Sequence, residues 1–138
     1  MKFTGALSIS LMLGAAAVTG TGSAAAAPTT IPFQINPAPF GNPNGSFDVR
    51  PAHCGVRVGE RPGVAVVTGS DAGGWGCWLA TPVHWVNVST GASGAARLSD
   101  GLNGIPSFAN LETGPGQVMI LLVPGGTSTP GFTSVLVP

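Results

Sequence analysis

The sequence has 138 residues, and charged residues make up only 7% of it, compared with about 25% in an ordinary soluble domain. The formal net charge is zero and no basic run is present. This excludes a nucleic-acid-binding protein, because binding to phosphates depends on clustered Lys and Arg. The chain is rich in Gly (22) and Pro (13), yet 43% of it is hydrophobic, which excludes a disordered polar tract and favours short strands joined by tight turns.

Residues 1–26 have the pattern of a secretory signal peptide. Lys2 gives the positive start, an apolar stretch covers residues 3–18, and a run of small residues includes Ala24 and Ala26. The small residues predict cleavage after Ala26, and the short apolar stretch without a basic flank predicts no transmembrane anchor in the mature chain. Removal of Lys2 leaves a mature chain without lysine. We therefore expect a secreted or cell-envelope protein with a single extracytoplasmic domain.

The mature chain contains two cysteines, Cys54 and Cys77. An even number of cysteines in an exported protein predicts a disulfide. The alternative is a zinc site formed by these cysteines with His53 and His84. Because His53 and Cys54 are adjacent, they are poorly placed around one tetrahedral ion, and the chain has no C-x-x-C or H-x-x-x-H pair. We predict a structural disulfide, no metal site and no cofactor.

Residues 27–45 form a Pro-rich extended arm, and residues 46–138 are predicted to form the folded domain. Five prolines between residues 28 and 43 exclude a helix in the arm. The arm also carries several apolar side chains, so it either pairs with the domain as an edge strand, where proline is tolerated, or stays mobile.

The longest stretch without Gly or Pro after residue 45 is shorter than an average helix, so we expect no helices. Apolar residues and turn residues instead predict short strands at seven places, with turns at residues 89–91 and 124–131 closing two hairpins. The predicted strands cover residues 47–49, 56–58, 64–68, 83–89, 94–98, 117–123 and 132–137. This spacing predicts an all-β sandwich or barrel.

The segment 118–123 is apolar at every position. Such a strand is either central and covered on both faces, or it presents an apolar stripe to a ligand, a partner or lipid. We expect the covered arrangement, because soluble monomers rarely expose large apolar patches.

Two strings are faintly similar to the histidine and serine motifs of chymotrypsin-like proteases: P-A-H-C, which contains His53, and G-S-D-A-G-G, in which Ala72 replaces the nucleophilic serine. The strings are also too close together for two barrels. An unrelated triad of Ser70 and Asp71 with His53 or His84 remains an alternative, but spacing alone does not establish one. We predict no catalytic residues.

The string G-G-W-G-C-W-L contains Trp75 and Trp78. We expect Trp78 and the nearby Trp85 to pack over the disulfide, and Trp75, which lies between glycines, to be exposed. Arg57 and Arg61 have a glutamate beside them and are expected to be solvated or in ion pairs, with contact to an anionic surface as the alternative. The candidate binding residues are therefore Trp75, Trp78, Arg57 and Arg61.

The run from V-H-W-V-N-V-S-T-G-A-S-G through G-P-G-Q-V-M-I-L-L-V to P-G-F-T-S-V-L-V-P resembles small exported immunoglobulin-like proteins of actinobacteria, over residues 47–138. This resemblance implies an immunoglobulin-like antiparallel β-sandwich of about seven strands outside the cytoplasmic membrane. The chain is also similar in mature length, signal and sandwich type to the neocarzinostatin-like apoproteins, which hold an apolar ligand in a cleft but have two disulfides.

The expected function is that of a non-enzymatic exported module, which acts at the cell envelope or in the medium by surface contact with a protein or an envelope polymer. One alternative is a carrier of a small apolar ligand in a Trp-lined cleft. The other is a small hydrolase built around His53, Ser70 and Asp71.

Overall fold

The computed structural model describes residues 26–45 and 49–138. The predicted signal peptide lies outside the described residues except for Ala26, as do Phe47 and Asp48 of the first predicted strand. One short 3-10 turn, η1 (Ala72–Gly74), is the only helical element in the described ranges. No helix there is long and apolar enough to span a membrane. The strands are β1 (Thr29–Pro32), β2 (Ala38–Pro39), β3 (Cys54–Val58), β4 (Val64–Gly69), β5 (Pro82–Asn87), β6 (Ser93–Arg97), β7 (Ala109–Glu112), β8 (Gly116–Leu122), β9 (Ser128–Thr129) and β10 (Gly131–Val137).

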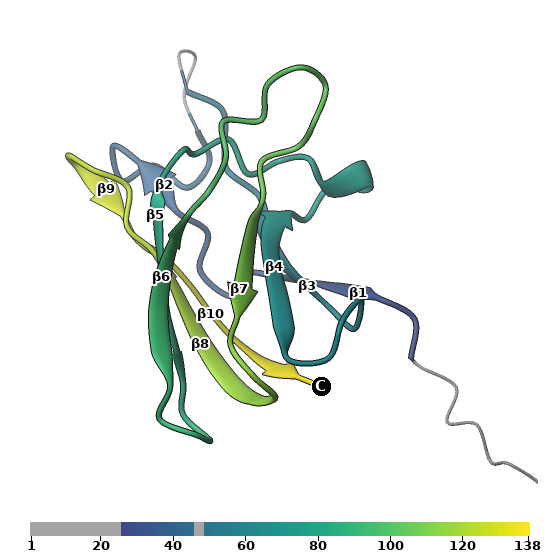
Figure 1. The fold of residues 1–138 in the computed structure, drawn as a ribbon. Coiled ribbons are helices and arrows are strands. Elements are labelled where there is room, and N and C mark those ends of the chain that lie inside the picture. Colours follow the sequence, from purple (N-terminus) through teal and green to yellow (C-terminus); the bar gives the residue numbers. More distant parts are fainter. Residues whose placement is uncertain (1–25, 46–48) are drawn as a thin grey trace, which may run out of the picture.

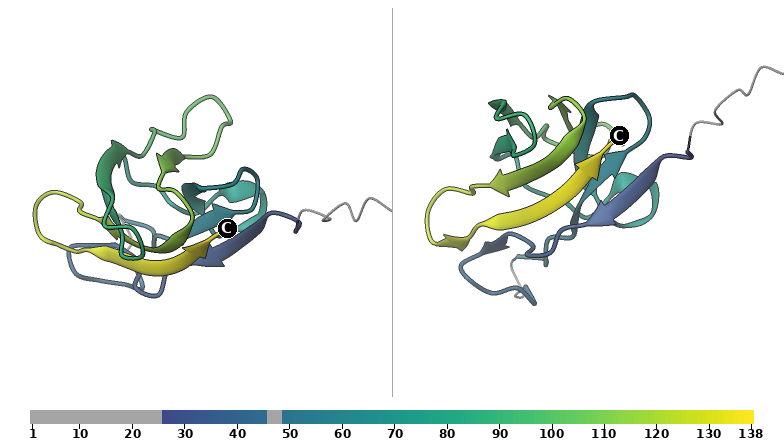
Figure 2. Two further views of the ribbon diagram at one scale, coloured as in Figure 1. Left: turned by 60° about the horizontal axis from the view of Figure 1, so that its bottom comes forward. Right: turned by 90° about the horizontal axis from the view of Figure 1, so that it is seen from below.

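The strands form two four-stranded antiparallel sheets that face each other (Figures 1 and 2). The order is β1-β3-β4-β7 in the first sheet and β10-β8-β5-β6 in the second, and β2 pairs with β9 in a small third sheet. The prediction of an all-β protein with antiparallel sheets is therefore confirmed. The turn after β5 and the segment between β8 and β10 close hairpins, as the sequence predicts.

The core lies between the two sheets and is built by alternation along the strands. In β8, Val118, Ile120 and Leu122 are fully buried, while the residues between them are exposed. Val135 and Val137 of β10 face the same core. Burial of each such side chain stabilises the fold by roughly 1.5–3 kcal/mol. The apolar side chains at every second position of these strands therefore hold the two sheets together.

Strand β7 was not expected from the sequence. Its residues A-N-L-E alternate between buried and exposed positions, and it pairs with β4 at the edge of the first sheet. A four-residue alternation between loops rich in Gly and Pro is too short to distinguish from a loop. Its place beside β4 is determined by pairing with a strand about 40 residues earlier in the chain.

The Pro-rich arm belongs to both sheets. Strand β1 pairs with β3 in the first sheet, as the edge-strand alternative predicts. Ile35 then pairs with Phe132 of β10, and β2 pairs with β9. Gln34 adds a contact in which its Oε1 accepts from the Ser134 amide at 2.9 Å. The arm therefore crosses from the edge of one sheet to the edge of the other.

The predicted disulfide between Cys54 and Cys77 is confirmed. Both residues are buried, and they join the start of β3 to the loop that follows η1. The amide of Cys54 also donates to Asn36 Oδ1 at 2.8 Å, which ties the arm to the same point. Because each sulfur is bonded to the other, the zinc alternative loses both of its thiolate ligands.

Replacing Gly69 with alanine is expected to displace the loop over residues 70–77 and to lower the free energy of unfolding by roughly 2 kcal/mol. A Cβ at this position would lie 1.8 Å from the carbonyl oxygen of Trp75, an oxygen that accepts from the Asp71 amide. Urea unfolding should show the loss, whereas Gly125→Ala, where a Cβ meets nothing within 4 Å, should stay within about 0.5 kcal/mol of the parent. Equal stability of both variants would contradict this reading of the loop.

Candidate functional site

The outer face of the second sheet is largely apolar across β5, β8 and β10, and its polar side chains are His84, Gln117 and Ser134. Met119 and Leu121 of β8 point away from the core, between buried neighbours. Leu121 pairs with His84 of β5 and with Phe132 of β10, and Met119 pairs with Val86 of β5. Side chains opposite each other on one face of a sheet are in contact range, so these rows form one surface. We call this surface the apolar face; it consists of Val86, Met119, Leu121, Val123, Phe132 and Leu136.

A hollow of about 340 Å³ lies in the apolar face. Its lining contains one titratable side chain, His84, and every lining residue belongs to β5, β8 or β10, so strands form its floor and no loop among the described residues lines it. The lining residues are His84, Trp85, Val86, Met119, Ile120, Leu121 and Phe132.

The exposure of this face corrects the expectation that residues 118–123 form a strand covered on both sides. Met119 and Leu121 are 37% and 38% exposed. It is β4 that is buried at every position. Its outward-facing Val66 lies between Arg57 of β3 and Asn110 of β7, and the aliphatic stem of an arginine can cover an apolar neighbour in this way. The sequence of β8 resembles that of β4, but its neighbours do not cover it.

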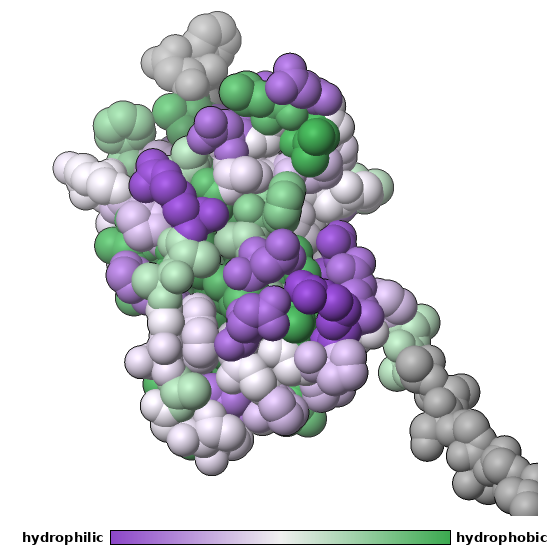
Figure 3. Space-filling view, viewed as in Figure 1, coloured by the Kyte–Doolittle hydropathy of each residue, from purple (hydrophilic) through white to green (hydrophobic). Residues whose placement is uncertain are grey.

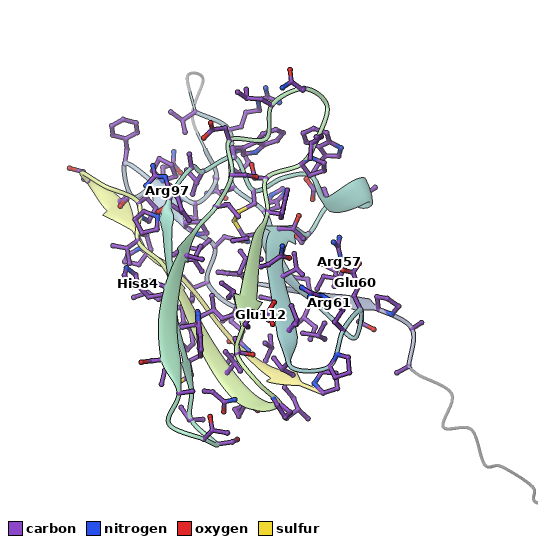
Figure 4. The ribbon with its side chains drawn as sticks, viewed as in Figure 1. Arg57, Glu60, Arg61, His84, Arg97 and Glu112 are labelled. Carbon is purple, nitrogen blue, oxygen red and sulfur yellow. A yellow bond between two sulfur atoms is a disulfide. The ribbon has the colours of Figure 1, made fainter. Side chains whose placement is uncertain are left out.

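The predicted binding residues Arg57 and Arg61 are in ion pairs. Arg57 Nε lies 2.7 Å from Glu60 Oε1, and Arg61 Nη2 lies 3.3 Å from Glu112 Oε1. Figure 4 shows Arg57, Glu60 and Arg61 together beside the first sheet, with Glu112 on the neighbouring β7. All four side chains are partly exposed, so each pair contributes only about 0–1 kcal/mol. These arginines pair with acidic neighbours and leave little cationic surface for an anion.

Two of the three tryptophans differ from the expectation. Trp78 is 44% exposed and is not among the partly buried side chains that pack against the core with Cys54 and Cys77. Its Nε1 donates to the carbonyl of Pro51 at 3.2 Å, and the guanidinium carbon of Arg50 lies 4.7 Å from its ring centre. Trp75 is half-buried, and Trp85 packs against the core. Trp78 is exposed although it directly follows the buried Cys77.

The candidate triad contains a histidine–carboxylate pair. His53 Nδ1 lies 3.2 Å from Asp71 Oδ1, and both side chains are about half exposed. Ser70 meets His53 only through the backbone, where its amide donates to the His53 carbonyl at 2.9 Å. In the part of the chain that the structure describes, no hydroxyl is hydrogen-bonded to the His53 ring. A serine nucleophile requires such a base within hydrogen-bond reach.

The structure thus separates the predicted binding residues. Trp75 and Trp78 belong to the loops after β4, whereas Arg57 and Arg61 lie on and beside the first sheet. Sequence reasoning identified β8 as a possible apolar stripe but missed Val86 and Phe132, which only strand register brings beside it. No protein-family model, no curated protein and no solved structure matches the chain.

Proposed function

We propose that the protein is an exported, non-enzymatic immunoglobulin-like module that works at the cell envelope or in the medium by binding a partner protein to its apolar face. The order of strands supports the immunoglobulin-like part of this proposal. The chain changes sheet between β4 and β5, returns between β6 and β7 to lie beside β4, and changes again to place β8 beside β5. These crossovers follow the Greek-key pattern of immunoglobulin-type sandwiches.

The observation that carries the binding proposal is the apolar face itself. An exposed row of Met119, Leu121 and Val123 runs along the centre of a sheet, and Val86 and Leu136 are also exposed on the same face. Contiguous apolar patches on soluble proteins mark sites of interaction, because leaving them in water is unfavourable. The face carries no carboxylate and one histidine among its lining residues, so a partner need not match a charge pattern.

The shape of the face favours a protein over a small ligand. Sites for small molecules enclose most of the ligand's surface, but this hollow is formed by strands alone and is open on its outer side. A second apolar protein surface can cover the whole width of β5, β8 and β10. The small-ligand carrier is the second candidate, favoured by the almost wholly apolar lining of the hollow.

The geometry around His53 supports the non-enzymatic part of the proposal. The imidazole is oriented by Asp71, but its hydrogen-bond partners among the described residues include no nucleophile. The pair also stands in solvent at half exposure, where a reacting group would not be shielded from water.

Replacing Leu121 with aspartate is the direct test of the apolar face. It places a charge at the centre of the contact, and we expect it to weaken binding of the partner protein at least 100-fold, since an uncompensated charge in an interface is strongly unfavourable. Asn110→Asp, at an exposed strand position on the first sheet, is the control and should leave the affinity unchanged. The partner is identified by photo-crosslinking from position 119 in the native host, and its affinity is then measured by calorimetry with both purified proteins.

Native mass spectrometry of the unmodified protein distinguishes the possible occupants of the apolar face. A stoichiometric complex with another protein, lost on Leu121→Asp and kept on Asn110→Asp, supports the proposal. A homodimer that is lost on Leu121→Asp and kept on Asn110→Asp would show that a second copy of the chain, and not another protein, occupies the apolar face. A bound small molecule would show that the occupant is a ligand. Equal affinity of both variants for the crosslinked protein would overturn the proposal.

A further inference from the structure

The two ends of the paired sheets differ in their chemistry. One end, uppermost in Figure 1, carries the long loops, and we call it the loop end. Its exposed large apolar side chains are Phe40, Trp78, Leu102, Ile105 and Phe108. The turns at the opposite end cover residues 59–63, 88–92 and 113–115, and they contain no aromatic residue. The space-filling view shows hydrophobic residues gathered over the upper loops (Figure 3).

The loop between β6 and β7 presents two aliphatic side chains at its tip. Asn103 and Gly104 both have positive φ, and they form a tight turn between Leu102 and Ile105, closed by a 3.2 Å bond from the Ile105 amide to the Leu102 carbonyl. Leu102 is 65% exposed and Ile105 57%. The turn therefore holds both side chains out into solvent, away from the core.

The base of this loop is fixed, so the tip is not a loose segment. The Ser99 amide donates to the Phe108 carbonyl at 3.1 Å, and the Phe108 amide donates to Ser99 Oγ at 2.9 Å. Thr68 of β4 donates from Oγ1 to the Ser107 carbonyl at 3.0 Å. These bonds anchor the loop to the first sheet and maintain the exposure of its tip.

Phe40 is presented in a similar way by another loop at the same end of the sheets. It has a φ of 57°, a conformation that is unfavourable for a bulky residue, and its side chain is 73% exposed. Its amide donates to the Thr127 carbonyl at 2.8 Å, which holds this backbone in place. Backbone strain that exposes an aromatic ring has no benefit for folding, and such strain is typical of binding sites.

Trp78 and Arg50 give the loop end an amphipathic element. The Trp78 ring is apolar, its Nε1–H is already paired with a backbone carbonyl, and the Arg50 guanidinium stacks on it. Tryptophan with a nearby cation is favoured at the boundary between headgroups and acyl chains.

Among the described residues of the loop end, positive and negative charges balance. Arg50 and Arg97 are the cationic residues, Asp71 and Asp100 are the acidic ones, and His53 pairs with Asp71. These residues form no basic cluster of the kind that directs proteins to anionic surfaces. Contact of the loop end with a surface must depend on apolar side chains.

We propose that the loop end inserts into a lipid surface, with Leu102, Ile105 and Phe40 entering the acyl boundary and Trp78 lying at the headgroups. Aliphatic tips on separate protruding loops fit a lipid layer, which deforms around each tip, better than a polysaccharide, which stacks on flat aromatic rings. The proposal does not depend on the apolar face, which lies on the side of the second sheet. Docking by the loop end would leave that face accessible.

Vesicle co-sedimentation tests this proposal. The protein used comprises residues 26–138, which contain both sheets and the whole core, because the apolar stretch of the predicted signal peptide would partition into lipid by itself. Phosphatidylcholine vesicles are the probe. We expect the protein to partition, and the double variant Leu102→Ser/Ile105→Ser to lower the partition coefficient at least about tenfold, since two aliphatic side chains no longer leave water. Leu136→Ser is the matched control, because Leu136 is 67% exposed but lies on the apolar face.

Each outcome decides the matter. Partitioning that is lost in the double variant, kept in Leu136→Ser, and insensitive to 0.5 M salt supports insertion of the loop tips. No partitioning would overturn it, and so would partitioning that needs anionic lipid and disappears at high salt, because charge would then be responsible. Equal loss in Leu136→Ser would assign the contact to the apolar face. Near-ultraviolet circular dichroism confirms that each variant keeps its packing.

Discussion

Replacing Asn87 with alanine should lower the free energy of unfolding by about 4 kcal/mol, because the change removes the hydrogen bonds of a fully buried side chain to one buried and four partly buried backbone groups. The Asn87 side chain is fully buried at the end of β5. Its Nδ2 lies 3.0, 3.3 and 3.0 Å from the carbonyl oxygens of Thr113, Gly114 and Pro115, so two N–H groups serve three acceptors. Its Oδ1 accepts from the amides of Ser89 and Thr90 at 3.0 and 3.2 Å. One side chain therefore joins the turn after β5 to the segment between β7 and β8.

Urea unfolding monitored by tryptophan fluorescence measures this effect. Asn110→Ala, the same substitution at an exposed position of β7, is the control and should change stability by less than about 0.5 kcal/mol. A loss below about 1 kcal/mol for Asn87→Ala would mean that water reaches these carbonyls and that the side chain does not join the two segments.

Removing the disulfide by the double substitution Cys54→Ala/Cys77→Ala should lower the free energy of unfolding by roughly 3 kcal/mol. The bridge closes a loop with a sequence separation of 23 residues, so it restricts the unfolded chain. In the folded state it fixes the loop of Trp75 and Trp78 against the start of β3. A small domain has only about 5–15 kcal/mol of stability, so this loss is a large share.

Chemical denaturation of the variant beside the oxidised parent gives the size of the loss. Reduction of the parent by a phosphine should produce the same shift in midpoint, and a buried bridge should resist reduction until urea opens the fold. If the variant and the oxidised parent had equal midpoints, the loop over residues 70–77 would be held by its backbone bonds alone.

The sequence predicted the strands whose apolar side chains alternate and whose turns contain Gly or Pro. Strands β5, β8 and β10 begin and end near their expected positions, and the pairing of Cys54 with Cys77 follows from a count of two. The strands depend on local sequence patterns, and two cysteines can form only one pair, so both features can be predicted from a single sequence. Strand β7 lacks such a local signal, because its four residues become a strand only beside β4.

The candidate sites depend on relations between distant residues. Whether the apolar strand β8 is covered is decided by its neighbours, because an apolar run alone, which β4 and β8 both have, does not show whether the outer face of a strand is covered. Trp78 is exposed although it directly follows the buried Cys77, whereas the glycines on both sides of Trp75 led to the expectation that Trp75 would be the exposed one. The exposed loop tip was not predicted, because the sequence around Leu102 and Ile105 does not show that a tight turn exposes these two side chains.

The pairing of the arm with both sides of the fold determines what proteolytic cleavage of the arm would expose. The backbone of the arm pairs with β3 in the first sheet and with β9 in the small third sheet, and Ile35 forms a bridge to Phe132 at the start of β10, so the arm covers the edge of β3 and that of the β9–β10 segment. Proteolytic trimming through about residue 40 would uncover both at once. Unpaired strand edges recruit other chains, and a nicked molecule would present two of them, which makes an intact arm a safeguard against aggregation.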